Sequence, residues 1–106
     1  MITISVKITK EDKDVMVKMF ESVKDYRPII DDLDAVITYY IYLDIQSKLR
    51  ASQHNSKAIR LNIVSVCVFL KFIDNVYAKI GTYEMANALI LSGQIRKEIT
   101  KKVLTL

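Results

Sequence analysis

The sequence predicts a mainly α-helical fold in which a short N-terminal β-strand is followed by about four helices. Only two glycines and one proline interrupt the 106 residues, so long stretches carry no turn signal. Residues 2–8 alternate between apolar and polar side chains, whereas later apolar residues recur at helical spacings of three and four. A chain of this length can bury one core, and we therefore expect a single domain over residues 1–106.

The N-terminal segment is expected to be an amphipathic strand. Its alternation over β-prone residues places one set of side chains on the buried face, namely Ile2, Ile4, Val6 and Ile8. The opposite face carries Thr3, Ser5 and Lys7. No other segment offers a convincing second strand, so we expect this strand to pair antiparallel with its counterpart in a second copy, forming a homodimer.

Two helices are predicted in the first half of the chain. The first should begin near Lys10, where the Thr9 hydroxyl can cap it and Asp12 can answer the free amides of the first turn. It should end before Pro28, after the apolar series Met16, Met19, Phe20, Val23 and Tyr26. The second should begin after the carboxylates Asp31 and Asp32 and end near Ala51, beyond which the chain becomes polar.

The second half is predicted to be a helical hairpin, residues 56–106, that forms the core or a dimer interface. Its first helix, 56–80, should be capped by Asn55 or Ser56 and buried on most of its surface, because its polar side chains form only a thin stripe: Arg60, Lys71, Asp74, Asn75 and Lys79. A buried strand within residues 59–70 is the alternative, since Ile and Val are abundant there. In either case Cys67 is expected to be a small core side chain.

Turn signals bound the last helix of this hairpin. Gly81 is expected to end the preceding helix in a left-handed conformation, and Thr82 to cap the next one. This last helix should run towards Leu104, with a possible break at Ser92 and Gly93.

Little in the sequence indicates catalysis. The single histidine, His54, lies in a polar stretch without a neighbouring cysteine or suitably spaced carboxylate, so we expect no enzyme, metal site or cofactor. The uncharged runs 61–70 and 85–95, of ten and eleven residues, are too short to span a bilayer, and we expect a soluble, cytoplasmic protein. Residues 1–53 carry eight basic and nine acidic groups and residues 54–106 eight and three, so the basic surplus lies in the second half.

The order of elements in residues 2–43 resembles the ribbon-helix-helix family of DNA-binding proteins. The matching parts are the strand "ITISVKI", the capped helix "TKEDKDVMVKMFESV" and the helix "DDLDAVITYYIYL". The resemblance implies a ribbon-helix-helix-like part over residues 1–51, with Thr3, Ser5 and Lys7 reading base edges in the major groove. The chain departs from the family in its longer turn without glycine and in three carboxylates where a phosphate should dock: Asp31, Asp32 and Asp34.

Two functions therefore follow from the sequence. The first is a small homodimeric DNA-binding protein, a transcriptional regulator that reads double-stranded DNA with its paired N-terminal ribbon. The alternative is a helical protein-interaction module without DNA binding. Its basic C-terminal half would bind an acidic protein partner through Arg96, Lys97, Lys101 and Lys102.

Overall fold

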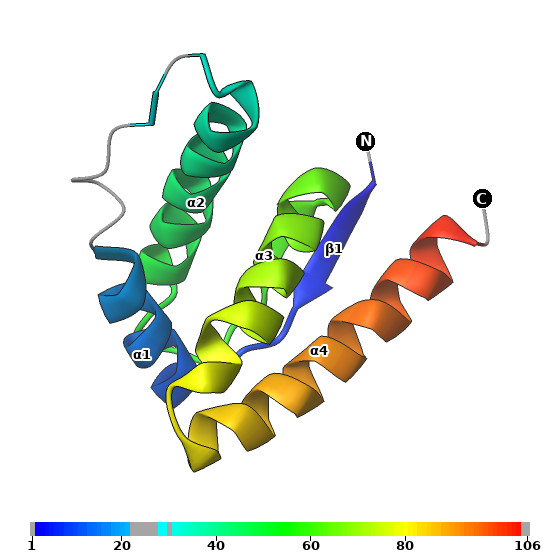
Figure 1. Ribbon diagram of the computed structural model, residues 1–106. Coiled ribbons are helices and arrows are strands. Elements are labelled where there is room, and N and C mark those ends of the chain that lie inside the picture. Colours follow the sequence, from blue (N-terminus) through cyan, green and yellow to red (C-terminus); the bar gives the residue numbers. More distant parts are fainter. Residues whose placement is uncertain (1, 22–27, 30, 105–106) are drawn as a thin grey trace.

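The computed structural model describes residues 2–21, 28–29 and 31–104. In chain order the elements are β1 (Thr3–Val6), α1 (Lys10–Phe20), α2 (Leu33–Ala51), β2 (Ile59–Asn62), α3 (Ile63–Asn75), the short 3-10 turn η2 (Tyr77–Lys79) and α4 (Thr82–Val103). The described chain is thus mainly helical and begins with a short strand, as the sequence predicts (Figure 1). Val23 and Tyr26, expected in the first helix, lie outside the described residues.

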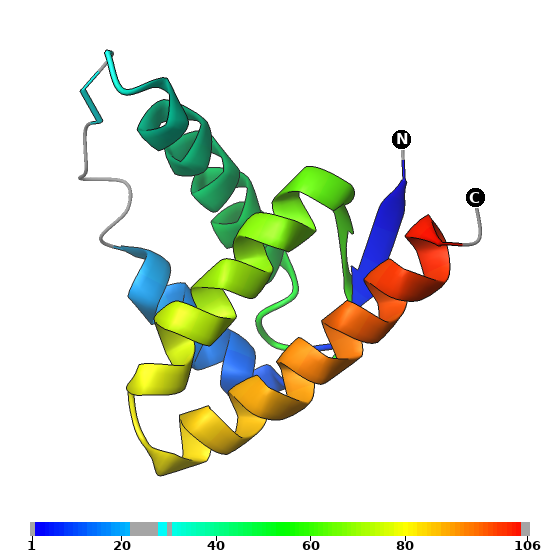
Figure 2. The ribbon, with the colours of Figure 1, turned by 45° about the vertical axis from the view of Figure 1, so that its right-hand side comes forward.

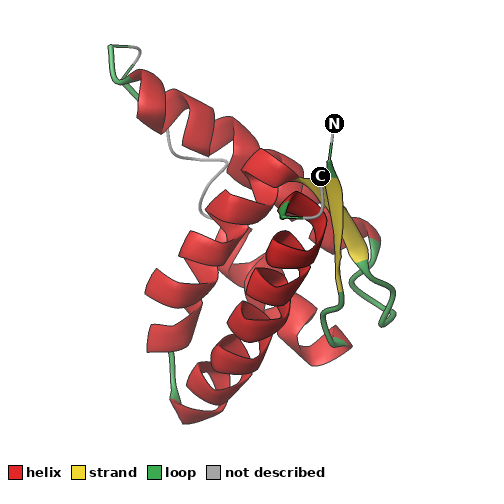
Figure 3. Cartoon of the chain, turned by 90° about the vertical axis from the view of Figure 1, so that its right-hand side faces the viewer, coloured by secondary structure: helices red, strands yellow, loops and turns green. Residues whose placement is uncertain are grey.

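β1 pairs antiparallel with β2 of the same chain, with Ile4 opposite Leu61 and Ser5 opposite Arg60. Figure 3 shows the two strands side by side at one margin of the helices. The prediction that no other segment of the chain supplies a second strand is therefore wrong, although the buried and exposed faces of β1 are as expected. The alternative of a strand within residues 59–70 is confirmed for Ile59–Asn62, whereas the chain is helical from Ile63 onwards.

The predicted starts of α1 and α2 are confirmed by their caps. The Thr9 hydroxyl oxygen accepts the backbone N–H of Asp12 at 3.2 Å and donates to that residue's carboxylate at 2.9 Å. Asp32 accepts the N–H of Ala35 at 3.1 Å, and α2 ends at Ala51 as predicted. Each cap satisfies an amide that the first turn leaves without a helical partner.

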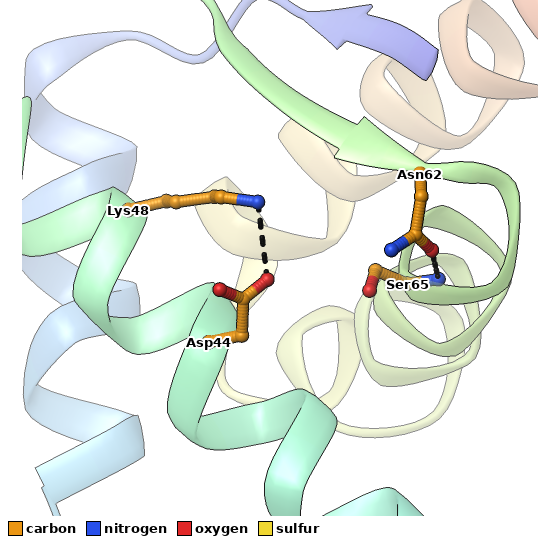
Figure 4. A network of polar contacts seen from close by, with 4 residues as sticks. All are labelled: Asp44, Lys48, Asn62 and Ser65. Carbon is orange, nitrogen blue, oxygen red and sulfur yellow. Dashed lines mark hydrogen bonds and ion pairs between the residues drawn. The ribbon is translucent and has the colours of Figure 1, made fainter. Parts of the chain in front are cut away.

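The start of α3 differs from the prediction. Its cap is Asn62, whose side-chain oxygen accepts the N–H of Ser65 at 2.8 Å (Figure 4), so the helix begins seven residues after Ser56, at Ile63. Figure 4 also shows the ion pair between Asp44 and Lys48 on α2, at 3.1 Å. β2 thus passes directly into α3, and a side chain that ends the strand begins the helix.

Aromatic rings form the centre of the packing between α1, α2 and α3. Phe20 of α1 stacks on Phe72 of α3 with ring centroids 4.4 Å apart, and Tyr42 of α2 meets Phe20 edge-on at 5.4 Å. Phe69 lies parallel to Phe72 at 6.3 Å. Such offset and edge contacts add to the burial of apolar area, and they join three helices into one core.

The outer face of α3 is less buried than predicted. Cys67 is exposed, which contradicts its expected place in the core, and Val64 keeps 54% of its surface. The reason is that α3 spans only Ile63–Asn75 and packs one face against its neighbours, so it is not surrounded. The predicted burial of the whole stretch 56–80 is therefore wrong.

The predictions around Gly81 and Gly93 also need correction. Gly81 has φ −174°, an extended conformation, so it is not a left-handed stop, and it rather than Thr82 precedes the first helical residue. α4 continues through Ser92 and Gly93 without a break and ends at Val103, close to the predicted end at Leu104. No helix within the described ranges has the length and apolar character needed to cross a membrane.

The first half of α2 extends away from the other helices, as Figure 2 shows. Its outward side carries Leu33, Ile37 and Tyr40 at helical spacing, with 68%, 54% and 66% of their surface exposed. The second half packs into the core through Ile45 and Leu49. α2 is therefore anchored at its C-terminal end.

Candidate functional site

One backbone hydrogen bond determines which edge of β1 is open. The N–H of Ile63 donates to the carbonyl oxygen of Ile2 at 3.1 Å, which places this pair at a hydrogen-bonding position of the ladder. Bonded and non-bonded pairs alternate in an antiparallel ladder, so the N–H and C=O groups of Ile4 and Val6 also point to β2. Those of Thr3, Ser5 and Lys7 then point to the opposite edge, which no described strand covers.

α4 runs alongside this open edge in the opposite direction, so the N-terminal end of β1 and the C-terminal end of α4 lie together (Figures 1 and 2). Two adjoining hollows of about 440 and 380 Å³ lie between α4 and the segment 5–9, and both are lined by Lys7 and Gln94. We call this feature the β1–α4 groove. Its other lining residues are Ser5, Val6, Ile95, Lys97, Glu98 and Lys101 in the first hollow and Ile8, Thr9, Asp12, Ser56, Asn87, Ile90 and Leu91 in the second.

The first hollow is predominantly basic. Lys7 of the β1 end and Lys97 and Lys101 of α4 line it together with one carboxylate, Glu98. All three lysines are exposed. Because their charges lie along a groove and not on a flat surface, their fields add where an elongated ligand would lie.

The floor of the groove is apolar, and the buried Asp12 carboxylate at its second hollow accepts hydrogen bonds from neighbouring side chains. Val6, Leu91 and Ile95 line the groove yet each keeps less than 5% of its surface exposed. Asp12, which is 4% exposed, accepts hydrogen bonds from Tyr77 and from Asn87, the latter at 3.1 Å. This carboxylate therefore joins α1 to η2 and α4 and has a structural role.

The Tyr77 hydroxyl, which donates to Asp12, has a raised pKa. Burial, followed by the hydrogen bond to Asp12 and the negative charge of that group, raises the pKa of the Tyr77 hydroxyl. The hydroxyl consequently stays protonated and remains a donor throughout the physiological range.

Lys13 anchors the loop that precedes β2. Its ammonium donates to the backbone carbonyl oxygens of Ser52, Asn55 and Lys57, the first two at 3.2 and 3.1 Å. Burial lowers the pKa of this lysine. This role of Lys13 was not predicted, although the sequence carries a signal for it: Lys13 falls one turn before Met16 on the apolar face of α1.

The structure brings together residues from both predicted sites. Lys7 belongs to the proposed DNA-reading set and Lys97 and Lys101 to the proposed partner surface, and all three line the β1–α4 groove. Arg96 instead faces α3, where it bonds Asp74 at 2.7 Å. Lys102 is exposed and lines neither hollow.

His54 lines neither hollow of the β1–α4 groove. His54 is exposed in the turn after α2, and no group of three or more His, Cys, Asp or Glu among the described residues could hold a metal ion. No family model matches the chain, and neither does any curated protein or solved structure with which it was compared. The β1–α4 groove is therefore the candidate functional site.

Proposed function

We propose that this protein is a small interaction module that binds an acidic protein partner in the β1–α4 groove. The observation that carries the proposal is the meeting of Lys7, Lys97 and Lys101, distant in sequence, along one groove with an apolar floor. Positive charge at the rim attracts and orients an acidic segment, while an apolar side chain of that segment can leave water by packing on the floor.

The magnitude of the charge effect limits the expected affinity. An exposed ion pair contributes about 0.2 to 1 kcal/mol, so three lysines supply at most about 3 kcal/mol. The remainder must come from the apolar floor and from backbone hydrogen bonds. We therefore expect dissociation constants in roughly the micromolar range that rise with salt, since exposed charges are screened within about 10 Å at 0.1 M ionic strength.

A paired charge reversal tests this proposal. The Lys97→Glu/Lys101→Glu variant should weaken binding of a fluorescein-labelled acidic peptide, acetyl-(Val-Glu)₃-amide, by about tenfold or more. The control is Lys71→Glu/Lys102→Glu, which changes the net charge equally at two exposed positions outside the groove. Equal losses in both variants would show a general charge effect and contradict the proposal.

DNA binding is the second candidate, favoured by the outward face of the β1–β2 ribbon. Thr3, Ser5 and Lys7 are exposed on this face, and the exposed Arg60 lies directly opposite Ser5. A two-stranded ribbon fits the major groove, where such side chains can reach base edges. In this function the protein would be the transcriptional regulator, related in its N-terminal part to ribbon-helix-helix proteins and acting as a homodimer, as proposed from the sequence.

Arg60 separates the two functions because it lies on the ribbon but lines neither hollow of the groove. If DNA is the ligand, a labelled duplex should bind at low salt, its affinity should fall steeply as salt rises, and Arg60→Glu should abolish binding. If the groove binds an acidic protein, Arg60→Glu should leave the peptide affinity nearly unchanged. Absence of duplex binding at low salt would exclude the DNA function.

A further inference from the structure

We propose that the acidic partner enters the β1–α4 groove as an extended segment and adds a third strand to the open edge of β1. This inference rests on the proposed function and specifies how the partner is held. The backbone N–H and C=O groups of Thr3, Ser5 and Lys7 point away from β2, towards the β1–α4 groove. An unpaired row of donors and acceptors is a template for another extended chain.

The dimensions of the groove suit an extended segment. Its lining residues on α4 run from Asn87 to Lys101, and fourteen helical rises of 1.5 Å cover about 21 Å. An extended chain advances about 3.3 Å per residue, so roughly six residues fit along this length. One turn of helix or a compact side chain would occupy only part of it.

The groove also selects a pattern of side chains. Successive residues of an added strand point to opposite sides, one set towards the apolar floor and the other towards the rim. The floor is formed by Val6, Leu91 and Ile95, and lysines at positions 7, 97 and 101 line the basic hollow. A segment that alternates apolar and acidic residues would therefore place each set against a complementary surface.

A second copy of β1 is a poorer occupant of this edge. Antiparallel pairing about Ser5 would place the Lys7 of each copy beside the other's basic hollow, which already holds Lys97 and Lys101. Like charges brought together in this way oppose association. The homodimer predicted from the sequence would use this same edge, so the two occupants exclude each other and can be told apart.

The experiment compares three forms of acetyl-(Val-Glu)₃-amide by fluorescence polarisation: the parent, a form N-methylated on all valine amides and a form N-methylated on all glutamate amides. Methylation removes backbone donors without changing charge. Only one of the two sets can face β1, so one methylated peptide should lose affinity by about tenfold or more and the other should bind nearly as the parent does.

A protein variant provides the reciprocal test. Ser5→Pro removes an outward-facing donor but no bond to β2, a position at which an edge strand accepts proline. Ser5→Ala keeps that donor and loses only the hydroxyl. We expect Ser5→Pro to weaken binding of the parent peptide at least about tenfold more than Ser5→Ala does, with circular dichroism checking that both variants fold.

The outcomes separate this inference from the proposed function. If binding depends on Lys97 and Lys101 but both methylated peptides bind as the parent does, the groove binds acidic partners without strand addition and the inference is wrong. If the parent peptide fails to bind at about 1 mM, both are wrong. Amide protection of Ser5 that rises with protein concentration alone would show a second copy in the groove and would also overturn the inference.

Discussion

The hydroxyl of Tyr77, in the turn after α3, donates a hydrogen bond to the buried carboxylate of Asp12 in α1. The two residues are 65 positions apart, and Asn87 of α4 donates to the same carboxylate oxygen. This contact lies beneath the second hollow of the β1–α4 groove, which Asp12 and Asn87 help to line. It therefore connects the stability of the fold with the shape of the candidate site.

Tyr77→Phe should destabilise the protein by about 1.5 to 3 kcal/mol, because a hydrogen bond to a charged group contributes this much and the buried Asp12 carboxylate loses one of its donors. Urea unfolding measures the difference. Tyr83→Phe is the matched control: Tyr83 is 58% exposed, so its loss of a hydroxyl should change stability by less than about 0.5 kcal/mol. Equal effects would mean that the contact with Asp12 adds no stability.

The same hydroxyl predicts a loss of stability in alkaline solution. Since the pKa of Tyr77 is raised in the folded state, this state keeps a proton that the unfolded chain loses above about pH 10. Its stabilising contribution is complete below that pH and declines as the pH rises further. The free energy of unfolding should therefore fall less steeply above about pH 10 in Tyr77→Phe than in the wild type.

Raising the pH has the opposite effect on the contribution of Lys13 to the free energy of unfolding. Its lowered pKa makes the unfolded chain bind more protons, so its contribution to stability rises with pH as the unfolded chain approaches its ordinary pKa. This contribution is the same in the wild type and in Tyr77→Phe, and the difference between their curves isolates Tyr77. Parallel curves would contradict the assignment.

Lys13→Met should loosen the loop before β2, because three backbone carbonyl oxygens lose their shared donor. A cost of about 1 to 3 kcal/mol is expected, with faster amide exchange over residues 52–57. Lys18→Met, on the exposed side of α1, serves as the control. Unchanged exchange in the loop would show that the ammonium does not hold it.

Cys67 offers a direct check of the outer face of α3. Its thiol is exposed, so it should react with a thiol reagent such as dithionitrobenzoate in the folded protein as fully as in denaturant. A thiol that reacts only after unfolding would place Cys67 in the core, as the sequence alone suggests.

Structural features that depend on residues close together in the sequence could be predicted. Thr9 and Asp32 act through hydrogen bonds to amides three residues away, and both helix starts followed from them. The alternation of β1 likewise gave its buried face, with Ile4 and Val6 in the core.

Non-local features could not be predicted in this way. The partner of β1 lies more than fifty residues away, and the apolar–polar alternation of Ile59–Asn62 is too short to separate a strand from the start of the next helix. The exposure of Cys67 depends on which side of α3 the other helices cover. The meeting of Lys7 with Lys97 and Lys101 follows from the antiparallel course of β1 and α4, which only the assembled fold determines.

The most direct test of this account is amide hydrogen exchange in β1, measured residue by residue at low protein concentration. Because β1 pairs with β2 and leaves its outer edge open, the amides of Ile4 and Val6 should be protected and that of Ser5 should exchange much faster. The parent acidic peptide should then slow exchange at Ser5. A Ser5 amide already as protected as those of Ile4 and Val6, or unprotected Ile4 and Val6 amides, would contradict the open edge on which the proposed function depends.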